Sequence, residues 1–148
     1  MNARPIPDGY RTITPSAAMY DCETAIAYYK EAFGAEERMR FAGPDGKVMH
    51  CELQIGDSIF MLGEPMDKPY AMHAMLYVED CDAVFRRAVK SGGTVKQHPT
   101  DQFYGDRTGS VVDPFGNEWH ISTHIEDVSE DEMHRRWEAL MAKDQAAE

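Results

Sequence analysis

The sequence has little that would hold it in a membrane or cross-link it covalently. Only three of its 148 residues are cysteines, and an odd, widely spaced set such as Cys22, Cys51 and Cys81 predicts a reducing compartment rather than a disulfide framework. No stretch approaches the ~20 apolar residues that a membrane-spanning helix needs. The first residues also lack the apolar core of a secretory signal. We therefore expect a cytoplasmic protein that does not enter a membrane.

Positive charge is also scarce. The chain has 15 Lys and Arg residues against 26 Asp and Glu residues, which gives a net charge of −11. Such a field repels phosphate backbones and anionic lipid surfaces, so neither nucleic acid nor membrane is an expected partner. A content of 43% apolar and 28% charged residues is typical of a folded globular domain.

An internal repeat organises most of the chain. The dipeptide Asp21-Cys22 recurs as Asp80-Cys81, and a turn glycine recurs at Gly56 and Gly116. Each repeat begins with an apolar run and continues through an acidic helix cap and a helix with apolar residues three and four apart. Three short strands separated by turn residues follow. The repeat unit is therefore predicted to be βαβββ.

This pattern predicts an α+β fold built from two βαβββ modules related by pseudo-twofold symmetry, with eight strands forming one cupped sheet and the helices outside it. We place the modules at about residues 10–66 and 70–124, within one domain covering residues 1–128. Residues 129–148 are predicted to form a C-terminal helix and tail.

Alternation along the strands gives each strand one apolar and one polar face, because residues two apart share a face. A polar face of this kind is often simply solvated. Here several polar faces carry groups that bind metals or move protons. In three predicted strands these positions are His50 and Glu52, then His73, Met75 and Tyr77, then Glu118 and His120.

Two segments resemble a known family. The turn Asp113-Pro114-Phe115-Gly116-Asn117 and the helix segments Ala25-Ile26-Ala27-Tyr28-Tyr29 and Ala32-Phe33-Gly34 resemble those of the vicinal oxygen chelate superfamily. This is the group of glyoxalase I, bleomycin-resistance proteins, fosfomycin-resistance transferases and extradiol dioxygenases. The resemblance covers roughly Ile13 to Asp127.

Three further runs are similar to those of the subgroup associated with phosphonate operons. They are Met49-His50-Cys51-Glu52, Phe103-Tyr104-Gly105-Asp106-Arg107 and Thr123-His124-Ile125-Glu126-Asp127-Val128.

The resemblance implies one inward metal-ligand position on the first and last strand of each module. Counting along the repeat places His73 and His120 at these positions in the second module, and Thr14 and Phe60 in the first. Strand parity alone makes Glu52 the candidate third ligand. Two histidines and one carboxylate suit a divalent metal such as Zn, Fe, Ni or Mn. Alternatively, each histidine is an ordinary hydrogen-bonded side chain.

Two functions follow from these residues. In the first, the protein is a metal-dependent enzyme of lyase, isomerase or dioxygenase type, in which an ion chelates two oxygens of a small substrate while Glu52 or Glu118 moves a proton. In the second, it is a metal-free protein that sequesters a drug or toxin. Tyr104 either covers the ligand or packs on the first module. The expected substrate-pocket residues are Thr14, His50, Phe60, Met75, Tyr77 and Tyr104.

The C-terminal segment carries its own apolar stripe. Ser129 and Glu132 form a capping box that predicts a helix start. Family members commonly form dimers, so we expect this helix to make a homodimer contact or to brace its own sheet. Trp137 should then be buried by a neighbouring chain or by that sheet. The stripe consists of Met133, Trp137, Leu140 and Met141.

Overall fold

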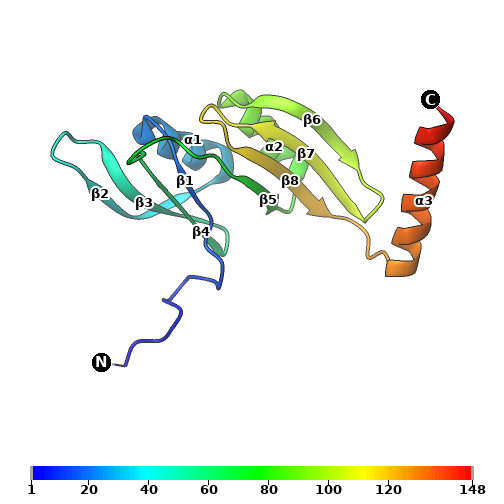
Figure 1. The fold of residues 1–148 in the computed structure, drawn as a ribbon, viewed down its shortest axis with the longest axis horizontal. Helices are drawn as coiled ribbons and strands as arrows, with labels where there is room; N and C mark the ends of the chain where they lie inside the picture. Colours follow the sequence, from blue (N-terminus) through cyan, green and yellow to red (C-terminus); the bar gives the residue numbers. More distant parts are fainter. Residues whose placement is uncertain (1, 148) are drawn as a thin grey trace.

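The structure is a computed structural model that describes residues 2–147, so Met1 and Glu148, at the ends of the predicted ranges, lie outside it. Two modules with the same element order lie side by side, and a helix follows them (Figure 1). The first module consists of β1 (Ser16–Ala18), α1 (Cys22–Phe33), β2 (Glu36–Ala42), β3 (Val48–Ile55) and β4 (Ser58–Gly63). The second consists of β5 (His73–Tyr77), α2 (Cys81–Lys90), β6 (Thr94–Asp101), β7 (Asp106–Val112) and β8 (Glu118–His124). The last helix is α3 (Glu130–Ala146).

The two modules have identical strand orders. The first sheet runs β1-β4-β3-β2 and the second β5-β8-β7-β6. In each, the first strand pairs parallel to the last and the other pairs are antiparallel. The α+β class and both βαβββ modules are thus confirmed. The detail that differs is hydrogen bonding, which joins the eight strands into two four-stranded sheets rather than one continuous sheet.

The segment that links the modules explains this separation. Tyr70 lies beside β1, where its backbone N–H and C=O both bond to Ala18. The free edge of β1 is therefore already occupied at this point. At this position β1 cannot pair with a further strand, and β5 pairs with β8 in the second sheet.

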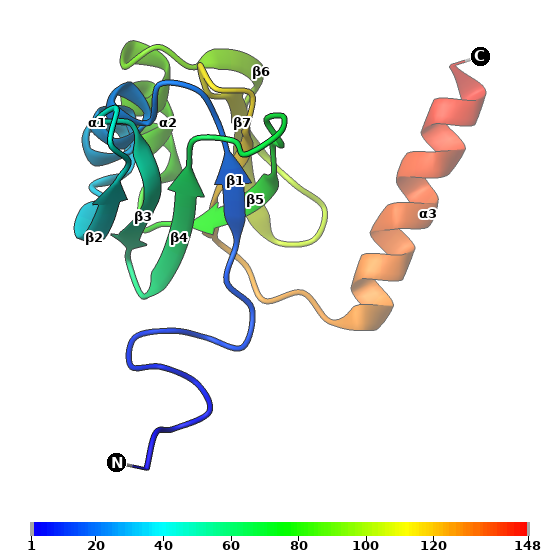
Figure 2. The ribbon, with the colours of Figure 1, turned by 60° about the vertical axis from the view of Figure 1, so that its left-hand side comes forward.

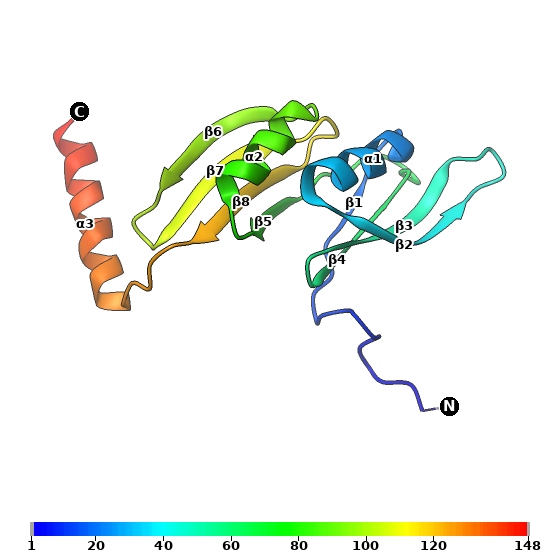
Figure 3. The same cartoon turned by 180° about the vertical axis from the view of Figure 1, so that it is seen from behind.

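Local sequence sets the helix limits as expected. Asp21 and Asp80 cap α1 and α2 by accepting hydrogen bonds from the backbone N–H groups of Thr24 and Ala83. Gly34 ends α1 in the left-handed conformation (φ 66°), which glycine adopts without steric cost. Both helices cover the same side of the molecule and lie next to each other (Figure 3).

A buried carboxylate joins the two modules. Asp113, in the turn before β8, accepts hydrogen bonds from the Tyr29 hydroxyl of α1 and from the Trp119 indole N–H (2.9 Å). Its other oxygen accepts from the backbone N–H groups of Phe115 and Asn117. Asp113 is only 4% exposed. One side chain therefore ties the first helix of one module to the last strand of the other.

The C-terminal helix α3 stands apart from both sheets (Figure 2). Ser129 caps it as predicted, by accepting from the Glu132 N–H. None of its residues is buried, and Trp137, whose ring lies 5.5 Å from that of Phe103, remains 47% exposed. The expectation that its own sheet buries Trp137 is therefore wrong, because α3 extends beyond that sheet. Between residues 2 and 147, no helix is long and apolar enough to cross a membrane.

Candidate functional site

The parallel pairing of β5 and β8 brings three ligand-type side chains together. In the register, His73 lies opposite Glu118 and Met75 lies opposite His120. Paired residues project from the same face of a sheet, and residues two apart on a strand share that face. His73, Glu118 and His120 therefore all project from the face opposite Trp119 and Ile121, which are buried in the core.

The ligand atoms of His73, Glu118 and His120 all lie within 4.8 Å of one another. The closest approach is 2.9 Å, between His120 Nε2 and Glu118 Oε2, and His73 Nδ1 lies 3.4 Å from the same oxygen. The side chain of Glu118 is 8% exposed, whereas that of His73 is 71% exposed. The group thus has a buried carboxylate at its base and an imidazole at its mouth.

Two neighbours fix the orientation and charge of this group. Ser110 Oγ on β7 lies 2.9 Å from His120 Nδ1. It therefore holds the ring so that Nε2 faces Glu118, as the outer partners of metal-binding histidines do. The Lys96 ammonium on β6 donates to the other oxygen of Glu118. This bond, together with the nearby His73, lowers the pKa of Glu118 from its ordinary value, so the carboxylate stays ionised.

Such a donor set fits a divalent metal ion. Catalytic zinc sites commonly have three protein ligands with an open position, and two histidines with one carboxylate also suit non-haem iron. The carboxylate is ionised, and the exposed His73 leaves one side of the group open. Without an ion, the same arrangement is a hydrogen-bonded polar cluster.

The third member of this group differs from the one expected. Glu52 lies on β3, in the other sheet, and Glu118 takes its place beside the two histidines within one chain. Parity correctly predicted the face of Glu52, but it carries no information about which sheet a strand joins. Glu118, one of the two candidates for moving a proton, lies beside His73 and His120.

Four of the expected pocket residues line one cleft between the modules, along the free edge of β5. Its volume is about 550 Å³. Apolar side chains including Trp119 form much of its wall. Tyr104 lies outside this cleft, in the loop before β7, with its ring 5.2 Å from that of Phe103. The four expected residues are Thr14, Phe60, Met75 and Tyr77.

Phe60 also shows a register error in the repeat. The predicted ligand position on β4 is occupied by Met61, which pairs with Ser16 as His120 pairs with Met75. Phe60 points into the core, where it is 3% exposed and its ring lies 5.5 Å from that of Trp119. The turn glycine precedes this position by four residues in the second module (Gly116 to His120) but by five in the first (Gly56 to Met61). Counting four residues from Gly56 therefore shifted the assignment by one residue and inverted the face.

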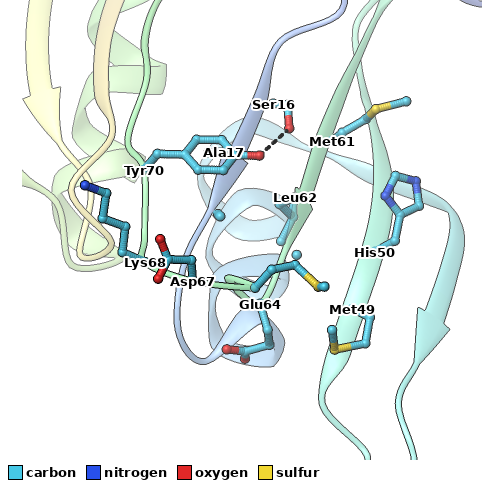
Figure 4. A pocket seen from close by; sticks show the side chains of 13 residues that line it. Ser16, Ala17, Met49, His50, Met61, Leu62, Glu64, Asp67, Lys68 and Tyr70 are labelled. Atoms are coloured by element: carbon cyan, nitrogen blue, oxygen red, sulfur yellow. Dashed lines mark hydrogen bonds between the residues drawn. The ribbon is translucent and has the colours of Figure 1, made fainter.

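His50 lines a second cavity, of about 440 Å³, on the sheet of the first module. In Figure 4, His50 and Met61 project from neighbouring strands, and the Ser16 and Tyr70 hydroxyl groups meet across the cavity at 3.3 Å. The structure thus places five of the six expected pocket residues in two separate cavities and Tyr104 in neither.

Sequence reasoning missed Ser110 and Lys96. A count across the hairpin could have found Ser110, because the turn that places Val112 opposite Glu118 also places Ser110 opposite His120. Lys96 carried no such signal, since β6 and β7 pair with irregular register.

Comparison with known proteins agrees with this architecture. Residues 16–121 match the model of the Glyoxalase/Bleomycin resistance protein/Dioxygenase superfamily. An uncharacterized protein of Mycobacterium bovis is 35% identical over 136 residues, covering 82% of this chain and 88% of the relative. An uncharacterized protein of Mycobacterium tuberculosis has the same identity, covering 82% of this chain and 79% of the relative.

Solved structures show the same fold. TioX from Micromonospora sp. ML1 superposes with a TM-score of 0.67 at 23% identity, covering 78% of this chain and 99% of that chain. A Pseudomonas aeruginosa protein superposes with a TM-score of 0.64 at 20% identity, again covering 78% of this chain and 99% of that chain.

Proposed function

The chain belongs to the glyoxalase/bleomycin resistance protein/dioxygenase superfamily, and from this premise we propose that it is a metal-dependent enzyme acting on a small, oxygen-rich substrate. One observation carries the proposal: the ligand atoms of His73, Glu118 and His120 converge within 4.8 Å. The proposed reaction is of lyase, isomerase or dioxygenase type.

The three converging residues would hold a divalent ion such as Zn, Fe, Ni or Mn. When bound, such an ion is a Lewis acid that holds two neighbouring substrate oxygens and stabilises the negative charge that develops on one of them. Ser110 keeps the His120 ring in its binding orientation. Lys96 keeps Glu118 ionised. Because a carboxylate with a lowered pKa is a weak base, Glu118 serves as a ligand and not as the group that moves a proton.

The substrate would enter from the cleft between the modules. Met75 is two residues from His73 on β5, lies opposite His120, and also lines the cleft. The cleft wall offers mostly apolar contacts, with Thr14 and Tyr77 as hydroxyl groups. A substrate with an apolar body and an oxygen-rich end matches this arrangement.

Elemental analysis tests the proposal directly. We expect protein expressed in metal-replete medium and purified without a histidine tag to carry close to one divalent ion per chain. His73→Ala and His120→Ala should lose that ion while circular dichroism stays unchanged. His134→Ala, which removes an exposed imidazole from α3, is the matched control and should keep it. A metal-free wild type, or full retention by both site variants, would refute the proposal.

The second candidate is a metal-free protein that sequesters a small apolar molecule. The cleft of about 550 Å³ favours it, because its walls are mainly apolar and do not depend on the histidines. If wild-type protein contains no metal yet protects a bound aromatic compound from solvent, this function replaces the first.

We also propose that the chain forms a homodimer through α3. Trp137 and Leu140 on α3 are 47% and 40% exposed, and burying a large apolar side chain contributes ~1.5–3 kcal/mol. Sedimentation should show a dimer that truncation after Asp127 weakens or abolishes. A monomeric full-length chain with fully solvated Trp137 fluorescence would contradict this.

We also propose a cytoplasmic location, which the three buried free thiols support. We further propose that the chain belongs to the subgroup associated with phosphonate operons, on the basis of the three runs quoted above.

A further inference from the structure

A buried carboxylate on the first module has no hydrogen-bond or ion-pair partner among residues 2–147. Glu52 lies in the middle of β3, between Met39 on β2 and Met61 on β4, and is 7% exposed. Its neighbours Cys51 and Leu53 are fully buried on the helix-covered face. By the alternation of the strand, Glu52 faces the other way, toward the side that carries His50.

Glu52 differs in this respect from the other buried acids. Among residues 2–147 the buried acidic side chains are Glu52, Asp106, Asp113 and Glu118. Asp106 bonds to Tyr77 and His124, and the other two have the partners described above. No hydrogen bond or ion pair joins the Glu52 carboxylate to any described residue. Among the described residues, every side-chain oxygen or nitrogen that is fully shielded from solvent has a hydrogen-bond partner. The Glu52 oxygens therefore still reach solvent and are open acceptors.

Comparison with the second module shows what is missing. Glu52 pairs with Met61 across β3 and β4, as Ser110 pairs with His120 across β7 and β8. In the second module this pair forms a hydrogen bond of 2.9 Å. In the first it cannot, because a thioether has no hydrogen to donate. The Glu52 carboxylate therefore accepts hydrogen bonds only from water or from a donor outside the chain.

The side chains opposite Glu52 are apolar, and a cavity that Glu52 itself does not line lies beside them. Met39 and Phe41 on β2 are 47% and 59% exposed. The neighbouring cavity is lined by Met61, His50 and Tyr70 (Figure 4). Charged residues on its rim are Glu64, Asp67 and Lys68. Aromatic faces attract organic cations, and flexible thioethers pack against apolar and aromatic groups. The net charge of −11 favours the approach of a cation.

We propose that this face binds a small organic ammonium ion with an apolar body, independently of the histidine site. Its N–H groups donate to Glu52, and its apolar part lies on Met39, Met61 and Phe41. A divalent metal suits the position less well, because one carboxylate among thioethers is a poor set for a hard ion.

A matched pair of probes tests the proposal on the intact protein. Benzylammonium and its neutral analogue benzyl alcohol are titrated into protein labelled with ¹³C at the methionine methyl groups. The Met39 and Met61 signals are identified with Met39→Leu and Met61→Leu variants. We expect benzylammonium to shift both signals and to bind at least about fivefold more tightly than the alcohol, as hydrogen bonds to charged groups exceed neutral ones. Equal affinity for the two probes would overturn the proposal, and this comparison needs no substitution at Glu52.

Two variants then isolate the carboxylate. Glu52→Gln should weaken benzylammonium binding about tenfold or more. Glu31→Gln removes the same charge from an exposed position on α1, on the other side of the sheet, and should change affinity less than about twofold. Unchanged binding in Glu52→Gln, or displacement of benzylammonium by Zn²⁺ through Glu52, would refute the proposal. His120→Ala should lose metal and keep benzylammonium binding, so failure of one site is distinguishable from failure of the other.

Discussion

The sheets of the two modules share a strand order but present different chemistry on equivalent positions. On the second sheet, a buried Ser110 orients His120, which meets Glu118. On the first sheet, the positions of Ser110 and His120 hold Glu52 and Met61. The second face satisfies its polar groups internally and brings two histidines and a carboxylate together. The first leaves one carboxylate open among thioethers.

This difference shows that the repeat specifies a scaffold and not a site. Backbone pairing fixes which side chains stand opposite each other, whereas the residue types at one pair of positions decide between a closed polar network and an open acceptor. Exchanging the residues of that pair is therefore the most direct way to test the comparison.

The largest effect is expected from giving the second module the residue of the first. His120→Met removes one of three ligands and leaves Ser110 without its partner. Metal affinity should fall at least about 100-fold, beyond the ~10–100-fold typical of losing an outer-shell partner. Competition with a chelating metal indicator measures this. Retention of metal within tenfold of wild type would show that the two histidines do not act together.

A smaller loss is expected when only the support of His120 is removed. Ser110→Ala leaves all three ligands but frees the ring that Ser110 holds, so metal affinity should fall ~10–100-fold. Ser110→Thr, which keeps the hydroxyl group, should restore much of it. If the alanine variant binds metal like wild type, Ser110 has no orienting role.

The converse exchange should give the Glu52 carboxylate a hydrogen-bond donor within the chain. Met61→His places a donor opposite Glu52, as His120 stands opposite Ser110. The carboxylate would then be occupied within the chain, and benzylammonium affinity should fall about tenfold, as measured by the methionine-methyl titration. Met61→Leu, which adds no donor, serves as the control and should fall much less. An equal loss in both variants would mean that packing, and not the open carboxylate, governs binding.

The smallest effect concerns the far end of the second sheet. Hydrogen bonds to Asp106 and Asp127 raise the pKa of His124 above its ordinary value. The stabilisation from its protonated form is therefore fully present below the unfolded pKa of about 6.5 and is lost as pH rises through the folded pKa. Urea unfolding should show that His124→Gln destabilises the protein more at pH 5.5 than at pH 9. An equal difference at both pH values would exclude a contribution from the charge.

Much of the fold was accessible from sequence because its signals are local. Asp21, Asp80 and Ser129 each mark a helix start, and Gly34 marks an end. The strand predicted around His50 and Glu52 is present and spans Val48–Ile55. Other strands are shorter than the apolar runs that predicted them: β1 begins at Ser16, although its run begins at Thr12. Strand limits depend on which neighbours pair, and an apolar run alone does not reveal this.

The candidate site was accessible only in part, for the same reason. Periodicity placed His73 and His120 on the polar face, and the structure brings them together. Parity did not reveal that Glu118, and not Glu52, lies beside the two histidines, because the two carboxylates lie on different sheets and sheet membership depends on long-range pairing. Strand parity also does not show whether a carboxylate has a hydrogen-bond donor. The lack of a donor to Glu52 is therefore evident only from the positions of its neighbours in the structure.

The carboxylate of Asp113 has a consequence for how the protein unfolds. Asp113 holds Trp119 of its own module and Tyr29 of the other. Unfolding of the second module would therefore leave the buried Tyr29 hydroxyl without its acceptor, and an unsatisfied buried polar group typically costs ~1–3 kcal/mol. The repeat halves are therefore not independent folding units, and melting should proceed as one cooperative event. A chain cut between the modules would regain its structure only when both pieces are present.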